Sequence, residues 1–280
     1  MATLLDLSQK IELRLLAALL KQVGAAVTPT PFLMAGAMAR DLLLVQAHDI
    51  HSNRATEDVD LAFLVKGWDE FGELREKLLM LDDFTELPKK GVHKLKFRNA
   101  IEVDILPFGG VERGDGTITL PPDNAFEMSM FGFKEALRAA VAVTLPDGAH
   151  IQMASLPALV ILKLSAWEER HFREPGKDAY DLLLIIKNYA IANNEGRLYD
   201  SNPHVMGSPA DYELAGAWLL GKDMAQLLDA AGRERVARLI ANETHEQGQL
   251  RLVGEMMRDD PDRALEFLTA LEHGFAEELP

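Results

Sequence analysis

Apolar residues recur at helical intervals near the N-terminus of the chain. Residues 8–23 place them three and four positions apart, which predicts an amphipathic helix with one buried face, and Gly24 is the expected stop. The proline-containing stretch 28–31 would break any continuation, because proline lacks a backbone N–H and fixes φ. The predicted buried face consists of Ile11, Leu15, Leu16, Leu19 and Leu20.

A strand, a tight turn and a second helix follow this segment. Residues 32–35 form a short apolar run, and Gly36 opens a helical pattern that continues to Leu44. A polar loop over 48–56 then leads into a strand at 59–65, and residues 68–81 return to helical spacing. The order predicts two strands of one sheet with helices between them.

Two further strands are predicted over 92–97 and 100–106, around a turn at Arg98 and Asn99. The second strand alternates strictly, with Glu102 and Asp104 on one face. Its other face is apolar and is expected to enter the core. The apolar positions are Ile101, Val103 and Ile105.

The pattern changes again after residue 155. Residues 109–124 read as an extended loop, with weaker strands near Ile118, at 141–145 and near Ile151. From Leu156 onward the chain is helical, over 159–172, 179–189, 211–241 and 246–275. We therefore expect an α+β protein, with a mixed β-sheet domain at 1–155 and an all-helical domain at 156–280.

Composition narrows the class of protein. No stretch approaches the roughly 18 apolar residues of a membrane span, and no signal sequence is visible, so we expect a cytoplasmic protein without a membrane partner. The absence of cysteine excludes disulfides and thiolate chemistry. A formal net charge of -15 means that a polynucleotide substrate would need a local basic patch.

One strand face carries three basic residues, Lys94, Lys96 and Arg98. This face either contacts a phosphate backbone or is the solvated side of the hairpin, and we favour the solvated side.

Asp58 and Asp60 carry the clearest chemical signal. Two carboxylates on one face of a strand that enters an apolar run repel each other, and this arrangement usually needs a cation or protons. Mg²⁺ is usually held by one or two carboxylates together with substrate phosphates. An isolated Asp-x-Asp is more often a solvated turn or strand edge, but Gly36 supplies a helix start whose backbone N–H groups attract anions, and Asp104 offers a third carboxylate.

These motifs resemble the AbiEii/AbiGii toxin-type nucleotidyltransferases of the DNA polymerase β superfamily. That family shows a glycine turn before a helix, then Arg-x-Ser/Thr-x-Asp-apolar-Asp on a strand, a third Asp on a later strand, a helix with a lysine, and Lys/Arg-Asp-x-Tyr-Asp-Leu. The similarity spans residues 32–185. The matching segments here are Ala35-Gly36-Ala37, Arg54-Ala55-Thr56-Glu57-Asp58-Val59-Asp60, Asp104, Leu162-Lys163-Leu164 and Lys177-Asp178-Ala179-Tyr180-Asp181-Leu182.

The resemblance implies an enzyme that uses Mg²⁺, or Mn²⁺, to transfer a nucleoside monophosphate from an NTP to a hydroxyl of tRNA or protein. It also implies a toxin of a toxin-antitoxin or phage-defence pair, with an antitoxin as partner, and a helical domain that completes the nucleotide cleft. Asp58, Asp60 and Asp104 would bind the metal and, with Lys163, carry catalysis. The implied nucleotide-binding residues are Gly36, Ala37, Arg40, Arg54, Thr56, Lys163, Asp178 and Asp181.

The glycine turn departs from the family pattern and leaves other functions open. Ala35 replaces the first glycine and Ala37 replaces the usual hydroxyl residue, so only backbone N–H groups remain as phosphate donors in the turn. One alternative is nucleotidyl transfer to a small cationic molecule such as an aminoglycoside, which suits the acidic chain. The other is a non-catalytic nucleotide-binding or regulatory module with this fold.

Overall fold

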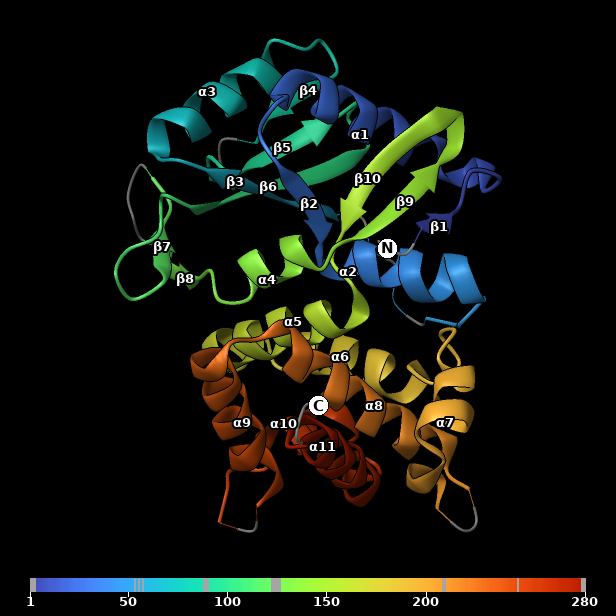
Figure 1. Cartoon of the computed structure of the whole chain (residues 1–280). Coiled ribbons are helices and arrows are strands. Elements are labelled where there is room, and N and C mark those ends of the chain that lie inside the picture. Colours follow the sequence, from blue (N-terminus) through green and yellow to red (C-terminus); the bar gives the residue numbers. More distant parts are fainter. Residues whose placement is uncertain are drawn as a thin grey trace. The chain divides into compact units, whose positions relative to one another are not determined.

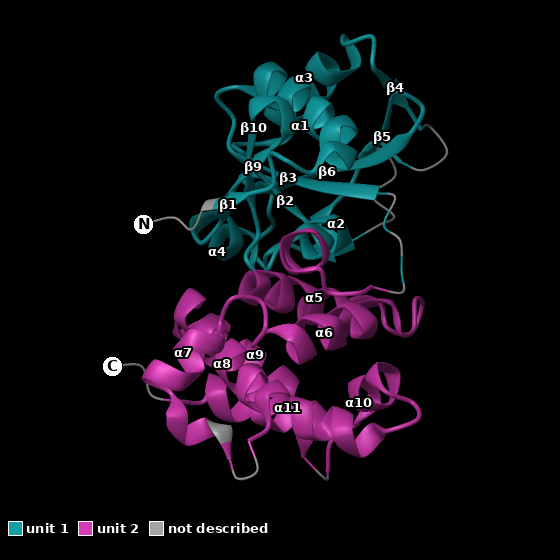
Figure 2. Cartoon of the chain, turned by 90° about the vertical axis from the view of Figure 1, so that its right-hand side faces the viewer, with its two compact units in different colours: residues 1–42, 53–155 teal, residues 43–52, 156–280 magenta. Residues whose placement is uncertain are grey.

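The computed structural model describes residues 4–52, 54, 56, 58–87, 91–121, 127–207, 210–245 and 247–277. Ala55 and Glu57 of the aspartate motif, and the end of the predicted loop 109–124, lie outside the described residues. The chain forms two compact units, one of residues 1–42 and 53–155 and the other of residues 43–52 and 156–280 (Figure 2).

The first unit is a mixed α/β structure (Figure 1). Its strands are β1 (Leu4–Asp6), β2 (Phe32–Ala35), β3 (Asp58–Val65), β4 (Phe84–Glu86), β5 (Lys94–Phe97), β6 (Ile101–Gly109), β7 (Thr117–Thr119), β8 (Glu127–Ser129), β9 (Val141–Leu145) and β10 (Ala149–Met153). Its α-helices are α1 (Arg14–Val27), α2 (Gly36–Asp41), α3 (Trp68–Leu79) and α4 (Phe133–Arg138). Short 3₁₀ turns lie at Ile11–Leu13 and Pro146–Gly148, and a π-helical turn over Leu42–Gln46 follows α2.

Eight strands form one sheet in the order β1-β9-β10-β2-β3-β6-β5-β4, and β7 and β8 form a separate hairpin. Strand β3 pairs antiparallel to β2 and parallel to β6, and β6 pairs antiparallel to β5. Helices α1 and α3 pack together on one face of the sheet, and α2 and α4 lie on the other (Figure 1). The α+β fold expected from the sequence is confirmed.

The alternation in β3 and β6 divides the two faces of the sheet. The odd-numbered residues Val59, Leu61, Phe63, Val103 and Ile105 are buried with at most a trace of exposure. The even-numbered Asp58, Asp60, Glu102 and Asp104 therefore share the opposite face, because side chains alternate along a strand. Phe108 lies further along that face and packs against Phe133 of α4, so the core there begins only beyond the acidic positions.

Helix α1 differs from the prediction at both ends. Ile11 is 67% exposed and Leu15 is 37% exposed, so two of the five residues assigned to the buried face lie outside it. The helix also continues through Gly24, which was the expected stop, and ends before Thr28 and Pro29. A single glycine costs an otherwise favourable helix only about 1 kcal/mol, whereas proline cannot continue it.

The turn between β5 and β6 is confirmed at Arg98 and Asn99. Both residues have positive φ, 48° and 53°, as the central residues of a type I′ turn do, and Ala100 N–H donates to the Phe97 carbonyl at 3.0 Å. The first strand pair beyond the turn is Phe97 with Ile101, so three residues connect the strands. Lys94 and Lys96 share one face of β5, as the alternation predicted, whereas Arg98 lies in the turn itself. The hairpin register then places Lys94 opposite Asp104 and Lys96 opposite Glu102.

The second unit is helical. Two long segments that the sequence presents as single helical stretches are each divided, near Asp229 and near Asp260, where a carboxylate caps the next helix through a backbone N–H. No helix in the described part of the chain is long and apolar enough to cross a membrane. The helices are α5 (Leu156–Arg170), α6 (Lys177–Asn188), α7 (Glu195–Ser201), α8 (Tyr212–Leu227), α9 (Ala230–Thr244), α10 (Arg251–Met256) and α11 (Pro261–Phe275), with a 3₁₀ turn at Pro203–Met206.

Candidate active site

A row of four residues crosses the middle of the large sheet. Ala35 of β2 lies opposite Asp60 of β3, Asp60 lies opposite Asp104 of β6, and Asp104 lies opposite Lys94 of β5. Directly opposed residues on neighbouring strands point to the same face, with Cβ atoms about 5 Å apart. The two carboxylates that the sequence placed on separate strands are therefore immediate neighbours.

Asp104 has one oxygen engaged and one without a partner. The ammonium group of Lys94 lies 2.5 Å from Asp104 Oδ2. Asp104 Oδ1 is buried and accepts no hydrogen bond. A buried carboxylate oxygen without a donor is costly, so this atom is suited to a ligand that brings a proton or a cation.

The backbone at Gly36 lies against the carboxylate of Asp60. Gly36 has a φ of +71°, and a Cβ built there would be 1.8 Å from Asp60 Oδ2. No other residue type fits this position, both because the backbone is left-handed and because the carboxylate occupies the space. The turn that opens α2 and the aspartate pair therefore form one local structure, with Ala37 in the first turn of the helix.

The carboxylates fit a divalent ion that also takes ligands from its substrate. Asp58 is exposed at the start of β3, and Asp60 and Asp104 are half-buried. Among the described residues, no three His, Asp or Glu side chains are gathered closely enough to hold an ion by themselves. Mg²⁺ in phosphate-handling sites is usually held by one or two carboxylates plus phosphate oxygens, and the unpartnered Asp104 Oδ1 suits that role.

Arg40 and Thr56 belong to a separate network in the first unit. The guanidinium of Arg40 is fully buried and donates to Asp41 Oδ1 from Nε at 2.8 Å and from Nη2 at 2.5 Å. Thr56 donates to Asp41 Oδ2 at 2.7 Å, which ties the segment entering β3 to the end of α2. Arg54, two residues earlier, is exposed. The predicted binding residues Arg40 and Thr56 thus brace the glycine turn against β3.

The remaining predicted residues form a buried cluster in the helical unit. Lys163 of α5 lies 2.5 Å from Asp181 Oδ2 and 3.2 Å from Asp178 Oδ1, both on α6. Arg170 donates to the two oxygens of Asp178 at 2.7 Å each. Lys163 is 8% exposed, Asp178 2% and Asp181 1%. Asp178 and Asp181, three positions apart on α6, thus both lie against Lys163 of α5.

Ion pairing dominates the electrostatics of this cluster. Burial raises the pKa of Asp178, but the hydrogen bonds from Arg170 and the charge of Lys163 outweigh it and lower the pKa below its ordinary value. Next to Asp178 on α6, the hydroxyl of Tyr180 lies 3.4 Å from that of Ser52. This contact attaches the segment 43–52 to the helical unit.

Lys94, at the end of the row, and its neighbour His93 were not among the site residues predicted from the sequence. Lys94 was assigned to the solvated side of its strand, but it is half-buried and contacts Asp104. His93 has a buried Nδ1 without a hydrogen-bond partner. Burial lowers the pKa of His93, Asp104 opposes that shift and Lys94 adds to it, so the ring tends toward the neutral form. A two-residue turn at Arg98 and Asn99 would have placed Lys94 opposite Val103, whereas the observed pairing of Phe97 with Ile101 places it opposite Asp104. This contact therefore had no signal in the sequence.

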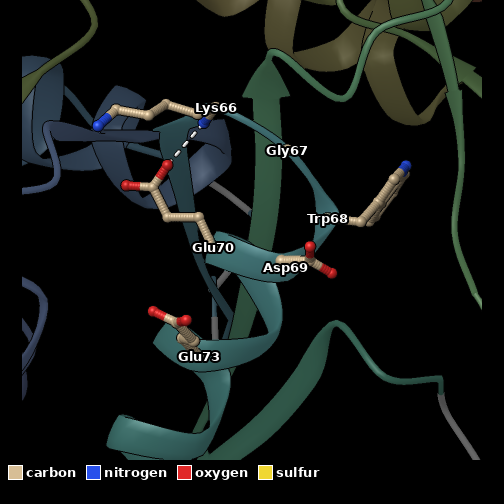
Figure 3. A pocket seen from close by; sticks show the side chains of 6 residues that line it. All are labelled: Lys66, Gly67, Trp68, Asp69, Glu70 and Glu73. Atoms are coloured by element: carbon tan, nitrogen blue, oxygen red, sulfur yellow. Dashed lines mark hydrogen bonds between the residues drawn. The ribbon is translucent and has the colours of Figure 1, made fainter.

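A shallow pocket of the first unit lies away from the row (Figure 3). It surrounds the start of α3, where the backbone N–H of Lys66 donates to Glu70 Oε2 at 2.7 Å. Lys66 follows Asp60 by six residues along an extended segment, or about 20 Å at the rise of a β-strand. The pocket is thus at the far end of β3 from the aspartates. Its lining residues are Lys66, Gly67, Trp68, Asp69, Glu70 and Glu73.

Comparison with solved structures returns distant matches. A crystal structure of ANT(2″)-Ia in complex with adenylyl-2″-tobramycin is 16% identical over 64% of this chain and 92% of that chain, with a TM-score of 0.36. A solution structure of the antibiotic-resistance factor ANT(2″)-Ia is 15% identical over 68% of this chain and 95% of that chain, also with a TM-score of 0.36. No curated protein matches the sequence.

Comparison with protein families gives a match over most of the chain. The sequence profile described as "Nucleotidyl transferase AbiEii toxin, Type IV TA system" aligns with residues 18–271. The matched range contains the glycine turn, the three aspartates and the buried cluster of α5 and α6. The chain therefore belongs to the AbiEii nucleotidyltransferase toxin family of type IV toxin-antitoxin systems.

Proposed function

We propose that this nucleotidyltransferase transfers a nucleoside monophosphate from an NTP to an acceptor hydroxyl at the row of Asp60 and Asp104, with Mg²⁺ bound by Asp58, Asp60 and Asp104. The observation that carries the proposal is the buried, unpartnered Asp104 Oδ1 on the strand next to Asp60. A bound divalent ion supplies a positive charge that stabilises the phosphoryl oxygens as the bond to the leaving group breaks.

The residues of the row have separate tasks in this proposal. Asp104 completes the metal site through Oδ1, the oxygen that Lys94 leaves available, and helps to deprotonate the acceptor hydroxyl. The backbone N–H groups at Gly36 and Ala37 bind phosphate oxygens, and no side chain intervenes at Gly36. Arg40, through Asp41 and Thr56, keeps this turn in register with β3.

The cluster of the helical unit supports a positioning role for its carboxylates. Lys163 is proposed to neutralise charge on the nucleotide triphosphate, and Asp178 and Asp181 hold its ammonium group in place. Lys163 and Arg170 carry two positive charges, and the two carboxylates carry two negative charges, so the cluster is neutral. The carboxylates thereby fix the position of the Lys163 ammonium group. Arg54, which is exposed, is proposed as a further phosphate contact.

Two classes of acceptor remain candidates. The family assignment to type IV toxin-antitoxin systems favours a cellular target such as a tRNA or protein hydroxyl, with an antitoxin as partner. The formal net charge of -15 favours a small polycation such as an aminoglycoside, because the field of the protein attracts it and repels nucleic acid.

Labelling experiments separate these acceptors. The protein is incubated with each α-labelled NTP and Mg²⁺, in parallel with total tRNA, with a cell protein extract and with aminoglycosides. We expect label on tRNA or protein, and none with the Asp60→Asn variant. Label on aminoglycosides alone assigns the second acceptor class, and absence of label from every acceptor contradicts the proposed reaction.

A further inference from the structure

Lysines of β5 accompany the carboxylates of β3 and β6 in two parallel rows. One row contains Asp58, Glu102 and Lys96, and the next contains Asp60, Asp104 and Lys94. The two rows are on the same face of the sheet, because their members are two residues apart on every strand. Each lysine therefore lies opposite one carboxylate, but only the second row includes two of the proposed metal ligands.

Lys94 is placed to neutralise the carboxylate that Asp104 offers to the metal. Its ammonium group is 2.5 Å from Asp104 Oδ2, and the two side chains are only 25% and 14% exposed. At this distance and burial the pair is screened less than a surface ion pair, so it contributes to the charge of the site. The other oxygen of the same carboxylate has no partner.

A divalent ion bound to Asp104 would lie close to this ammonium group. The two oxygens of a carboxylate are closer together than the two atoms of a hydrogen bond, so two cations bound to them repel each other through a partly buried medium. If Lys94 moved away, the neighbouring half-buried carboxylates of Asp60 and Asp104 would repel each other without a counterion from β5. The lysine and the metal therefore compete for the same negative charge.

We propose that Lys94 is an internal counterion of the metal site: it competes with the divalent ion for Asp104 and keeps metal affinity low until the nucleotide brings further negative charge. The inference rests on the proposed function, since it concerns the same aspartates. Lys94 is a positioning residue in this account, because it acts through Asp104.

The competition predicts an increase in metal affinity when the charge is removed. In the Lys94→Met variant, whose unbranched side chain is one atom shorter and uncharged, the protein without nucleotide is expected to bind Mn²⁺ about tenfold more tightly than the wild type, a change of about 1.4 kcal/mol. A purely structural role predicts unchanged or weaker binding, because loss of the ion pair would only loosen Asp104.

The experiment measures the Mn²⁺ dissociation constant by electron paramagnetic resonance, with circular dichroism to confirm folding. Lys96→Met is the matched control, since it removes an identical charge from the same strand face one row away, and its affinity is expected to stay within twofold of the wild type. Lys94→Arg keeps the charge and is expected to retain wild-type affinity. Lys94→Gln repeats the charge removal with a polar side chain.

A double-mutant cycle locates the effect. In an Asp104→Asn background the Lys94→Met substitution is expected to change Mn²⁺ affinity less than twofold, because the shared carboxylate is gone. Unchanged or weaker Mn²⁺ binding in both Lys94→Met and Lys94→Gln, with wild-type binding that depends on Asp60, overturns the inference alone. Mn²⁺ binding that is the same in Asp60→Asn overturns the proposed metal site and the inference with it.

Discussion

Two charged clusters of this chain use the same residue types in opposite ways. In the helical unit, Asp178 accepts hydrogen bonds on both oxygens and Lys163 bridges it to Asp181, so the cluster is paired and buried. In the sheet, Asp104 has one oxygen on Lys94 and the other without a partner. The first cluster is complete without a ligand, and the second is not.

The difference follows from where the cations are. On α5, Lys163 and Arg170 are seven positions apart and both reach α6, so carboxylates and cations meet in equal numbers. On the sheet, the cation that contacts Asp104 comes from β5, at one side of the acidic strands. Asp104 therefore keeps one buried oxygen without a partner. Substitutions in the sheet row are therefore expected to reduce mainly transfer activity, whereas substitutions in the helical cluster are expected to reduce mainly the free energy of unfolding.

The largest expected effect is on catalysis at the sheet row. Asp104→Asn removes the proposed proton acceptor, and loss of a general base lowers kcat by about 10²–10⁴-fold. The free energy of unfolding should change by less than about 1 kcal/mol, because the Lys94 pair is partly exposed and a like-charge contact with Asp60 is relieved. Single-turnover transfer and urea denaturation measure the two quantities. A variant with full activity would exclude Asp104 as the base.

The matching change in the helical cluster is expected to cost stability. Asp178→Ala leaves Arg170 and Lys163 without their shared carboxylate, and breaking a buried pair in this way typically costs about 3–5 kcal/mol. Urea unfolding followed by tryptophan fluorescence reports on this unit through Trp167 of α5.

Glu174→Ala is the control for that change. The Glu174–Lys177 pair is close in sequence to Asp178 but its side chains are 46% and 37% exposed. Exposed pairs contribute about 0–1 kcal/mol, so the unfolding curve should barely move. Equal destabilisation by the two variants would show that the buried cluster is no more important than a surface pair.

Two glycine substitutions compare a crowded position with an open one. Gly36→Ala places a Cβ against Asp60 and strains a left-handed backbone, and we expect a loss of about 1–3 kcal/mol in stability together with loss of transfer. Gly24→Ala meets nothing within 4 Å inside α1 and should stabilise the helix by about 0.5–1 kcal/mol. Thermal unfolding and the transfer assay distinguish them. Retained activity in Gly36→Ala would contradict the close approach of the turn to Asp60.

The smallest expected effect is a pH dependence confined to acid. Ion pairing lowers the pKa of Asp178 from its ordinary value of 3.8, so the unfolded chain binds a proton that the folded chain does not. The stability contributed by Asp178 is therefore complete above its ordinary pKa and is lost as pH falls through the lowered one. The difference in unfolding free energy between the wild type and Asp178→Ala should begin to shrink below about pH 4 and keep shrinking as pH falls through the lowered pKa, measured by urea titration at each pH. A constant difference down to strong acid would contradict the ion-pair origin.

Local patterns were sufficient to predict much of this arrangement. Alternation in 101–106 placed Glu102 and Asp104 on one face, and helical spacing placed Asp178 and Asp181 together, because both follow from the geometry of single elements. The extent of α1 was less predictable, since Gly24 is compatible with a helix whenever packing favours it. The exposure of Ile11 was not predictable either, because it depends on whether another part of the folded chain packs over this side chain.

Pairing between distant elements was the part that the sequence did not reveal. The contact of Lys94 with Asp104 depends on a hairpin register in which three residues connect the strands, and Lys94 was assigned to a solvated face without it. The buried state of Arg40 depends on Asp41 meeting Thr56 across fifteen residues of chain. Such contacts arise from tertiary packing, which periodicity within one element does not encode.

Metal-dependent nucleotide binding tests the central claim most directly. The affinity for an NTP is measured by isothermal titration with and without Mg²⁺ in the wild type, in Asp60→Asn and in Asp178→Asn. Mg²⁺ is expected to strengthen binding in the wild type and in Asp178→Asn, and this gain is expected to disappear in Asp60→Asn. An undiminished Mg²⁺-dependent gain in Asp60→Asn would contradict the assignment of the sheet row as the metal site.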